Sequence, residues 1–190
     1  MKAVCIIPAR GGSVRIPRKN IAPFFGKPML HYAIANAWNC RLFDRVIVST
    51  DDNEIASVAT KFAAGRGEVA VYRRGPDGGT RGTMDGAREA LLKSKADAAF
   101  VCVLYPCCPL LNWGGLVQGY RALLQARPDG FHLYTHSAQA GTEGKVDAGG
   151  FYWCLAAGLL ANVDFLPFVS SVPVEVPEQF DINTPEDWAK

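Results

Sequence analysis

Short apolar segments alternate with helical patterns along this chain, and that alternation limits the folds open to it. Segments typical of buried strands lie at Ala3–Ile7, Arg45–Ser49, Val69–Tyr72 and Ala98–Leu104. Helical patterns lie at Pro28–Cys40, from a cap at Thr50 or Asp51 to about Ala63, at Thr83–Lys93 and at Trp113–Gln125. Such an order is typical of a parallel, doubly wound sheet with helices on both faces.

The last third of the chain continues this pattern less clearly. Further strands are predicted at Gly130–Thr135, Phe151–Cys154 and Val172–Val176. The sequence Thr184-Pro185-Glu186-Asp187 predicts a final helix, with a threonine cap, a proline at the first position and an acid three residues after the cap. We expect residues 1–190 to form a single domain with a three-layer α/β/α architecture and a mostly parallel sheet.

Charge and cysteine content narrow the function classes. The 20 basic and 18 acidic residues leave a net charge of +2, which gives no reason to expect nucleic acid or a membrane as a partner. The six cysteines form no CxxC pair, so we expect free thiols in a reducing compartment rather than a zinc site. The first apolar run is short and ends in proline and arginine, unlike a signal peptide, and a cytoplasmic location is therefore expected.

The loop Pro8–Asn20 is the first candidate site. In doubly wound sheets, ligands bind beyond the carboxyl ends of the strands, which selects this loop, residues 105–112 and residues 181–184. The first loop carries four cations and three small residues whose N–H groups could face an anion: Arg10, Arg15, Arg18 and Lys19, and Gly11, Gly12 and Ser13. The pattern predicts a triphosphate site, although a solvated basic loop is the simpler alternative; it matches neither a Walker A loop nor GxGxxG.

Several segments, taken in order, resemble one enzyme family. They are PARGGS-x-RIPRKNI at residues 8–21, FGKP at 25–28, VIVSTDD at 46–52, YPCCPLL at 105–111, DAGGFYW at 147–153 and FDINTPEDW at 180–188. Together they are similar to the CMP–acylneuraminate synthetase family, nearest its pseudaminic acid cytidylyltransferase branch. The resemblance spans nearly the whole chain, and it implies a Rossmann-like nucleotidyltransferase fold.

The resemblance also implies a reaction and its nucleotide site. Such enzymes join CTP to a nine-carbon sugar acid in the presence of Mg²⁺ and release pyrophosphate. By this likeness Arg10 and Lys19 would bind phosphates, with Lys19 stabilising the leaving pyrophosphate, and Asn20 would help to place the nucleotide. Arg73, Thr83 and Tyr105 would contribute to nucleotide binding; without the resemblance, these three are a surface charge, a helix cap and a packing residue.

The same likeness assigns the metal and sugar sites. Asp181 would be the Mg²⁺ ligand, since a carboxylate at a strand end suits a hard cation. Three residues of the DAGGFYW segment would contact the sugar acid: Asp147, Gly150 and Tyr152. Cys107 and Cys108 could suggest a nucleophile, but no histidine is near them in sequence to activate one.

The chain departs from the family pattern in the sugar and metal half. Four positions carry a different residue where lysine, threonine, glutamine and a second carboxylate are usual: Val14, Cys107, Gly150 and Asn183. The segment at about 136–150 is also shorter than in the family, where it carries sugar-binding residues and part of the dimer contact, so a homodimer would be weakened. Two alternatives follow: a degenerate nucleotide-binding relative with weak or no transferase activity, and a nucleotidyltransferase for a different sugar acid.

Overall fold

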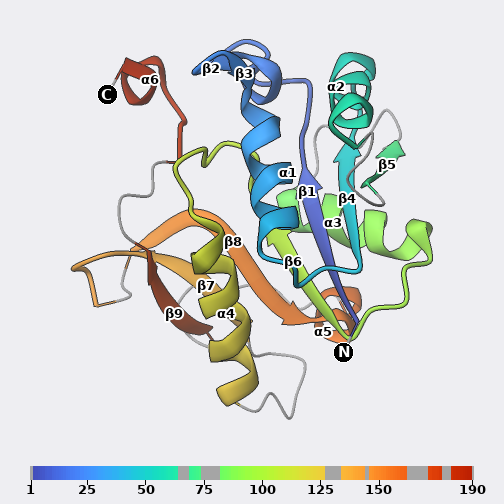
Figure 1. The fold of residues 1–190 in the computed structure, drawn as a ribbon, viewed down its shortest axis with the longest axis vertical. Helices are drawn as coiled ribbons and strands as arrows, with labels where there is room; N and C mark the ends of the chain where they lie inside the picture. The colour runs from blue at the N-terminus through green and yellow to red at the C-terminus, as the bar shows by residue number, and fades with distance from the viewer. Residues whose placement is uncertain are drawn as a thin grey trace.

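The sheet is built outward from β1 (Ala3–Pro8), whose six residues are all buried. The computed structural model describes residues 2–63, 69–73, 82–126, 134–143, 146–161, 171–176 and 181–189. Within them, seven strands form one sheet in the order β5-β4-β1-β6-β8-β7-β9 (Figure 1). The other strands are β4 (Arg45–Thr50), β5 (Val69–Arg73), β6 (Phe100–Leu104), β7 (Tyr134–Gln139), β8 (Asp147–Leu155) and β9 (Ser171–Val176).

The strand directions confirm a mostly parallel sheet. β1 pairs in parallel with both β4 and β6, β4 with β5, and β7 with β9. β8 lies antiparallel between β6 and β7. Because β1 and β6 are parallel neighbours, the loops that follow them leave the same edge of the sheet side by side, which places two of the predicted segments together.

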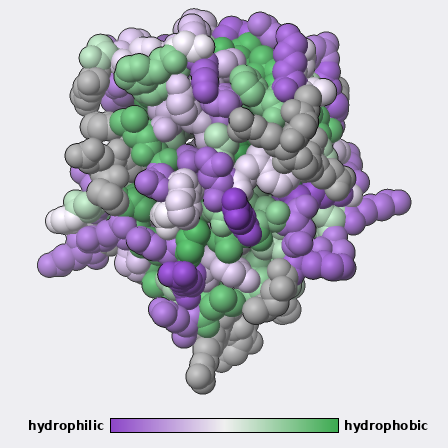
Figure 2. Space-filling view, in the orientation of Figure 1, coloured by the Kyte–Doolittle hydropathy of each residue, from purple (hydrophilic) through white to green (hydrophobic). Residues whose placement is uncertain are grey.

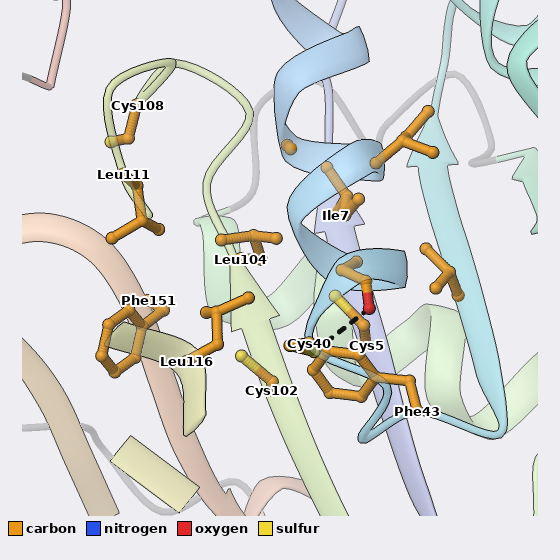
Figure 3. Close-up of a cluster of buried hydrophobic side chains, with 14 of the residues drawn as sticks. Cys5, Ile7, Cys40, Phe43, Cys102, Leu104, Cys108, Leu111, Leu116 and Phe151 are labelled. Carbon is orange, nitrogen blue, oxygen red and sulfur yellow. Dashed lines mark hydrogen bonds between the residues drawn. The ribbon is translucent and has the colours of Figure 1, made fainter. Parts of the chain in front are cut away.

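Helices cover both faces of this sheet. The helices α1 (Met29–Asn39), α2 (Asn53–Ala63) and α4 (Trp113–Gln125) pack on one face, while α3 (Thr83–Ser94) and α5 (Ala156–Leu160) pack on the other. Alternate residues of β1 serve the two layers: Cys5 and Ile7 pack in the cluster with Leu116 and Phe151 (Figure 3), and Ile6 packs in the opposite cluster. The three-layer α/β/α fold is therefore confirmed.

Most predicted elements appear within a few residues of their expected bounds, but the cap of α2 was assigned wrongly. Asp52, rather than Thr50 or Asp51, caps this helix: its Oδ1 accepts the backbone N–H groups of Glu54 and Ile55, each at 2.9 Å. Asp52 precedes the first helical residue by one position, and its short carboxylate reaches these two amides.

The terminal helix α6 (Pro185–Ala189) has the predicted capping arrangement. The Asp187 carboxylate accepts the N–H of Thr184 at 2.9 Å, and the Thr184 hydroxyl accepts the N–H of Asp187 at 3.3 Å. These reciprocal bonds satisfy two amides that the helix leaves free.

Other parts of the structure were not predicted. A 3₁₀ turn, η1 (Lys19–Ile21), leads into a small hairpin of β2 (Pro23–Phe24) and β3 (Lys27–Pro28), and α5 follows β8 directly. β8 begins four residues before the predicted Phe151. Of the strand predicted at Gly130–Thr135, residues 130–133 lie outside the described residues, as does most of the polar loop 73–82.

In the part of the chain that the structure describes, none of the helices is long and apolar enough to span a bilayer. On the face seen in Figure 2, hydrophobic and hydrophilic residues are intermixed rather than gathered into one large patch.

Candidate functional site

A cleft of about 290 Å³ opens at the carboxyl ends of β1 and β6. It is bounded by the loop after β1, the start of α3, the loop after β6 and the segment before α6. Its lining residues are Pro8, Arg10, Ser13, Val14, Arg15, Lys19, Asn20, Gly82, Thr83, Tyr105, Pro106, Cys107, Asp181 and Asn183. All three segments selected from the sequence thus contribute to one site.

The loop after β1 is fastened to the junction of β4 and α2. The Gly11 N–H donates to Asp51 Oδ1 at 2.8 Å, and the Arg18 guanidinium binds both carboxylate oxygens of Asp52 and also Glu54. A Cβ added at Gly11 would lie 2.7 Å from Asp52 Oδ2, so glycine is required for this approach. The loop therefore has a defined path before any ligand binds.

The ion pair between Arg18 and Asp52 is electrostatically strong. The hydrogen bond from Arg18, together with the helix N–H groups, lowers the pKa of Asp52 to about 2. The same contact with Asp52 raises the pKa of Arg18. Arg18 therefore remains paired with acids at neutral pH and does not line the cleft, where the cations of the described residues are Arg10, Arg15 and Lys19.

Lys19 and Asn20 link the first loop to its surroundings. Lys19 Nζ donates to the carbonyl oxygen of Ile182 at 2.7 Å and to Asn183 Oδ1 at 3.2 Å. The buried Asn20 side chain donates to the carbonyl oxygen of Arg10 at 2.8 Å. Lys19 is thus held at the cleft by groups 163 and 164 residues away in sequence, and Asn20 fixes the backbone that carries Arg10.

Asp181 lines the same cleft and is linked to Lys19 through Asn183, which bonds both side chains. Its Oδ1 accepts the Cys107 thiol at 2.9 Å, and its Oδ2 accepts the Asn183 amide at 2.6 Å. A Cβ at Gly149 would approach Oδ2 to 2.9 Å, so β8 also packs closely against this carboxylate. Both oxygens are held by neutral donors, which a cation can replace.

Tyr105 and Thr83 form the wall of the cleft between β6 and α3. The Tyr105 hydroxyl has hydrogen bonds with the side chains of Thr83 and Tyr152, and burial raises its pKa. The phenol is consequently a neutral group at physiological pH, able to donate or accept one hydrogen bond.

The structure does not bring the predicted sugar-binding residues into this cleft. The Asp147 carboxylate accepts the Gly149 N–H at 2.8 Å and the Tyr152 hydroxyl. Gly150 donates its N–H to Ser137 Oγ at 2.8 Å and accepts the Tyr105 N–H at 2.9 Å. These groups join β8 to β7 and to the loop after β6, and burial raises the pKa of Tyr152.

Two further predictions differ from the observed geometry. Arg73 is exposed and donates to the backbone oxygen of Asp52 at 2.5 Å, outside the residues that line the cleft. The expectation that the N–H groups of Gly11 and Ser13 face an anion is not met in this conformation, since they donate to Asp51 and, at 3.0 Å, to the Gly11 carbonyl oxygen. Gly12 is exposed and Ser13 lines the cleft.

Asp51 and Asp52 are the residues that sequence reasoning missed. The pair of acids directly after a strand was interpreted only as a helix start. The available signal was that a helix cap needs only one acid, whereas two stand here. Asp52 caps α2 and pairs with Arg18, and Asp51 accepts the Gly11 N–H of the loop after β1.

Comparisons with known proteins point to one enzyme family. A cytidylyltransferase family model matches residues 4–145. The chain is 44% identical over 126 residues to pseudaminic acid cytidylyltransferase of Campylobacter jejuni, covering 66% of this chain and 54% of that protein. It is 40% identical over 93 residues to CMP-N,N'-diacetyllegionaminic acid synthase of the same species, covering 48% of this chain and 38% of the relative.

Solved structures show the same fold. The 4-diphosphocytidyl-2C-methyl-D-erythritol synthase of Anaerococcus prevotii aligns with a TM-score of 0.70 at 11% identity, covering 99% of this chain and 93% of that one. The chain spans about half the length of the curated relatives it matches, at 54% of the pseudaminic acid enzyme. Next to the connection between β7 and β8, the Gln139 N–H donates to the Val146 carbonyl oxygen at 2.9 Å.

Proposed function

This chain belongs to the cytidylyltransferase family, and we propose from this that it joins CTP to a nonulosonic acid of the pseudaminic acid type, giving a CMP-sugar and pyrophosphate. The observation that carries the proposal is the cleft itself. Among the described residues, the cationic side chains of Arg10, Arg15 and Lys19 line it together with the carboxylate of Asp181. This charge arrangement suits a triphosphate and its metal ion.

The chain's own residues would contribute mainly position and charge. The sugar hydroxyl attacks the α-phosphorus while the bond to pyrophosphate breaks, so negative charge develops on the leaving group. Lys19, fixed by Ile182 and Asn183, would meet that charge, and Arg10 would bind the phosphates from the start of the loop. Groups that are already in place when charge develops supply most of the rate in such chemistry.

Mg²⁺ is part of the proposal, because the donor set fits it. Hard cations are commonly bound by one or two carboxylates together with substrate phosphates and water. Asp181 offers a carboxylate at the cleft, while the Asn183 amide oxygen beside it accepts hydrogen bonds from Lys19 and Arg15. When bound, the ion would offset phosphate charge. Full turnover in excess chelator would contradict this part.

The nucleotide would also contact the wall of the cleft. Asn20 holds the loop at Arg10, and Thr83 and Tyr105 present hydroxyl groups to the same space. Support for Asp147, Gly150 and Tyr152 as sugar ligands is weaker, since their polar groups bind one another and the neighbouring strands. The acceptor class is proposed from the two Campylobacter relatives, both named for nonulosonic acid nucleotides.

The direct experiment incubates the purified chain with CTP, Mg²⁺ and a panel of sugar acids: pseudaminic, legionaminic, N-acetylneuraminic and 3-deoxy-manno-octulosonic acid. Pyrophosphate release and the CMP-sugar, identified by mass spectrometry, are measured together. We expect the highest rate of product formation with pseudaminic acid. Product with another acid alone would favour the different-acceptor alternative. Stabilisation by CTP without product from any acid would favour a degenerate nucleotide-binding relative.

Two further properties belong to the proposal. All six cysteines are free thiols, which supports a cytoplasmic location. We also propose a homodimer, which the short connection between β7 and β8 would weaken. Light scattering during size-exclusion chromatography measures the mass of the particle. A monomer at micromolar concentration would contradict a stable dimer.

A further inference from the structure

Two adjacent cysteines and one aspartate meet at the edge of the cleft. Cys107 and Cys108 lie in the loop between β6 and α4, and Asp181 lies just before α6. One ligand atom from each of the three lies within 4.8 Å of the other two. We propose that these residues form a binding site for a thiophilic divalent cation of the zinc class, with the two sulfur atoms and one carboxylate oxygen as ligands.

One hydrogen bond already joins two of the three ligand groups. The Cys107 thiol donates to Asp181 Oδ1 at 2.9 Å, and the Cys108 thiol donates to the Gly149 carbonyl oxygen at 3.3 Å. A metal ion would replace the two thiol protons, which pass to solvent. The Cys107–Asp181 hydrogen bond would give way to one metal–sulfur and one metal–oxygen bond, and the Cys108 sulfur would exchange its bond to the Gly149 oxygen for a bond to the metal. The expected move is small, because the three ligand atoms have already converged.

The position of the cluster suits a zinc-class site with one open coordination position. The two cysteines are 7% and 3% exposed, so their sulfur atoms are shielded from bulk solvent. Cys107 and Asp181 nevertheless line the cleft, which gives an ion a route in and leaves a position for water or a phosphate oxygen. Three protein ligands and one exchangeable position are typical of reactive rather than purely structural zinc sites.

The ligand types discriminate between metals. Mg²⁺ takes oxygen ligands and would use Asp181 without the thiols, whereas Zn²⁺ and Cd²⁺ bind thiolates strongly. The spacing of the cysteines alone gave no zinc prediction, because Asp181 is 74 residues from Cys107 in sequence. Under the proposed function, a thiophilic ion here would compete with Mg²⁺ for Asp181 and inhibit turnover. That consequence rests on the proposed function, but the binding itself does not.

The test titrates the metal-free full chain with Cd²⁺ alone, without CTP, and follows the ultraviolet sulfur-to-cadmium charge-transfer band. We expect saturation at one equivalent and displacement by Zn²⁺. Cys107→Ser and Cys108→Ser should each weaken binding at least about tenfold, and Asp181→Asn should weaken it without removing the band. Cys40→Ser is the matched control, because the Cys40 thiol donates to the Ala37 oxygen at 3.1 Å in the core.

Three results would overturn the site. They are no charge-transfer band, a band unchanged in Cys107→Ser, and a band lost in Cys40→Ser. Circular dichroism and the melting temperature are recorded for every variant. If Cys108→Ser does not fold, Cys107→Ser decides the question, since Cys107 reaches the cleft. Cadmium binding with no transferase activity would support the site and reject the proposed function, so the two can fail separately.

Discussion

The half of the sheet formed by β5, β4, β1 and β6 differs from the half formed by β8, β7 and β9 in how it uses its polar side chains. In the first half, charged groups after the strands either line the cleft or fasten the loop that does, as Lys19 and Asp52 show. In the second, Asp147 and Tyr152 bind each other. The cleft is therefore a result of strand order, which brings the loops after β1 and β6 together, while Asp147 and Tyr152 bond to each other within β8.

The largest effect is expected at the point where the two halves meet. Asp181→Ala should lower kcat for CMP-sugar formation about 100-fold, or roughly 2.7 kcal/mol of barrier, because the proposed metal ligand is lost. An assay of pyrophosphate release at saturating substrate measures this kcat. The control is Glu175→Ala, which removes an exposed carboxylate from β9. A loss of less than about threefold for Asp181→Ala would separate this residue from the chemistry.

The next largest effect is expected from a substitution that packs against the second half of the sheet. A Cβ at Gly119 in α4 would lie 2.6 Å from a ring carbon of Phe151, in a fully buried contact with β8. Gly119→Ala should lower the free energy of unfolding by about 2 kcal/mol, measured in urea. CTP affinity should stay within about twofold, which is less than 0.5 kcal/mol. Gly114→Ala in the same helix is the control, because its Cβ would meet only the Asn112 side chain, with Oδ1 at 3.3 Å, and no aromatic ring.

Equal loss of CTP affinity and stability in Gly119→Ala would contradict the division, since it would show that the two halves depend on each other for nucleotide binding.

Two neighbouring glycines in the loop after β1 provide a matched pair of variants for the first half of the sheet. Gly11→Ala places a methyl group 2.7 Å from Asp52 Oδ2, whereas Gly12→Ala meets nothing within 4 Å. We expect CTP affinity to fall about tenfold, or 1.4 kcal/mol, in Gly11→Ala and to change little in Gly12→Ala. Calorimetric titration measures both. Equal affinities in the two variants would show that the path of the loop does not matter for binding.

The extent of sequence prediction also differs between the halves. Buried strands such as β1 and β6 were predicted because continuous apolar runs mark strands covered on both faces. Their parallel order then placed Lys19, Tyr105 and Asp181 at one edge, and the structure brings these three to one cleft. The Thr184 capping arrangement was also predicted, because it depends only on residues that are close in sequence.

What escaped prediction depends on side chains that meet from distant segments. Nothing local indicates that Arg18 binds Asp52 instead of facing a ligand, or that the Cys107 thiol bonds to Asp181. The antiparallel direction of β8 was not predicted, because the apolar run Phe151–Cys154 indicates a strand but not its direction. Tyr152 and Asp147 matched a motif, but a motif does not state which way a polar group points.

The smallest effect concerns the ion pair that fastens the loop. Asp52→Asn keeps a side chain able to cap α2 but removes the charge that binds Arg18, so stability at pH 7 should fall by about 1 kcal/mol after allowance for solvent screening. The pKa of Asp52 is lowered from 3.8 to about 2, so its contribution is complete above about pH 4 and is lost as pH falls through 2.

The difference between wild type and Asp52→Asn should therefore shrink between pH 4 and pH 2 in urea unfolding at each pH. Asp97→Asn is the control, because the ion pair of Asp97 with Lys2 is solvent-exposed. The exposed fractions of the Asp97 and Lys2 side chains are 84% and 62%. A difference that is constant with pH would show that Asp52 acts through capping alone.

The most direct measurement is the affinity of CTP for Lys19→Ala, by calorimetric titration beside wild type and Lys61→Ala. Lys61 is an exposed lysine in the last turn of α2, away from the cleft. Loss of a charge-assisted bond to phosphate should weaken binding by roughly 1.5–3 kcal/mol, or about 10- to 150-fold, with Lys61→Ala unchanged. CTP affinity equal to wild type in a folded Lys19→Ala would contradict the assignment of this cleft as the triphosphate site.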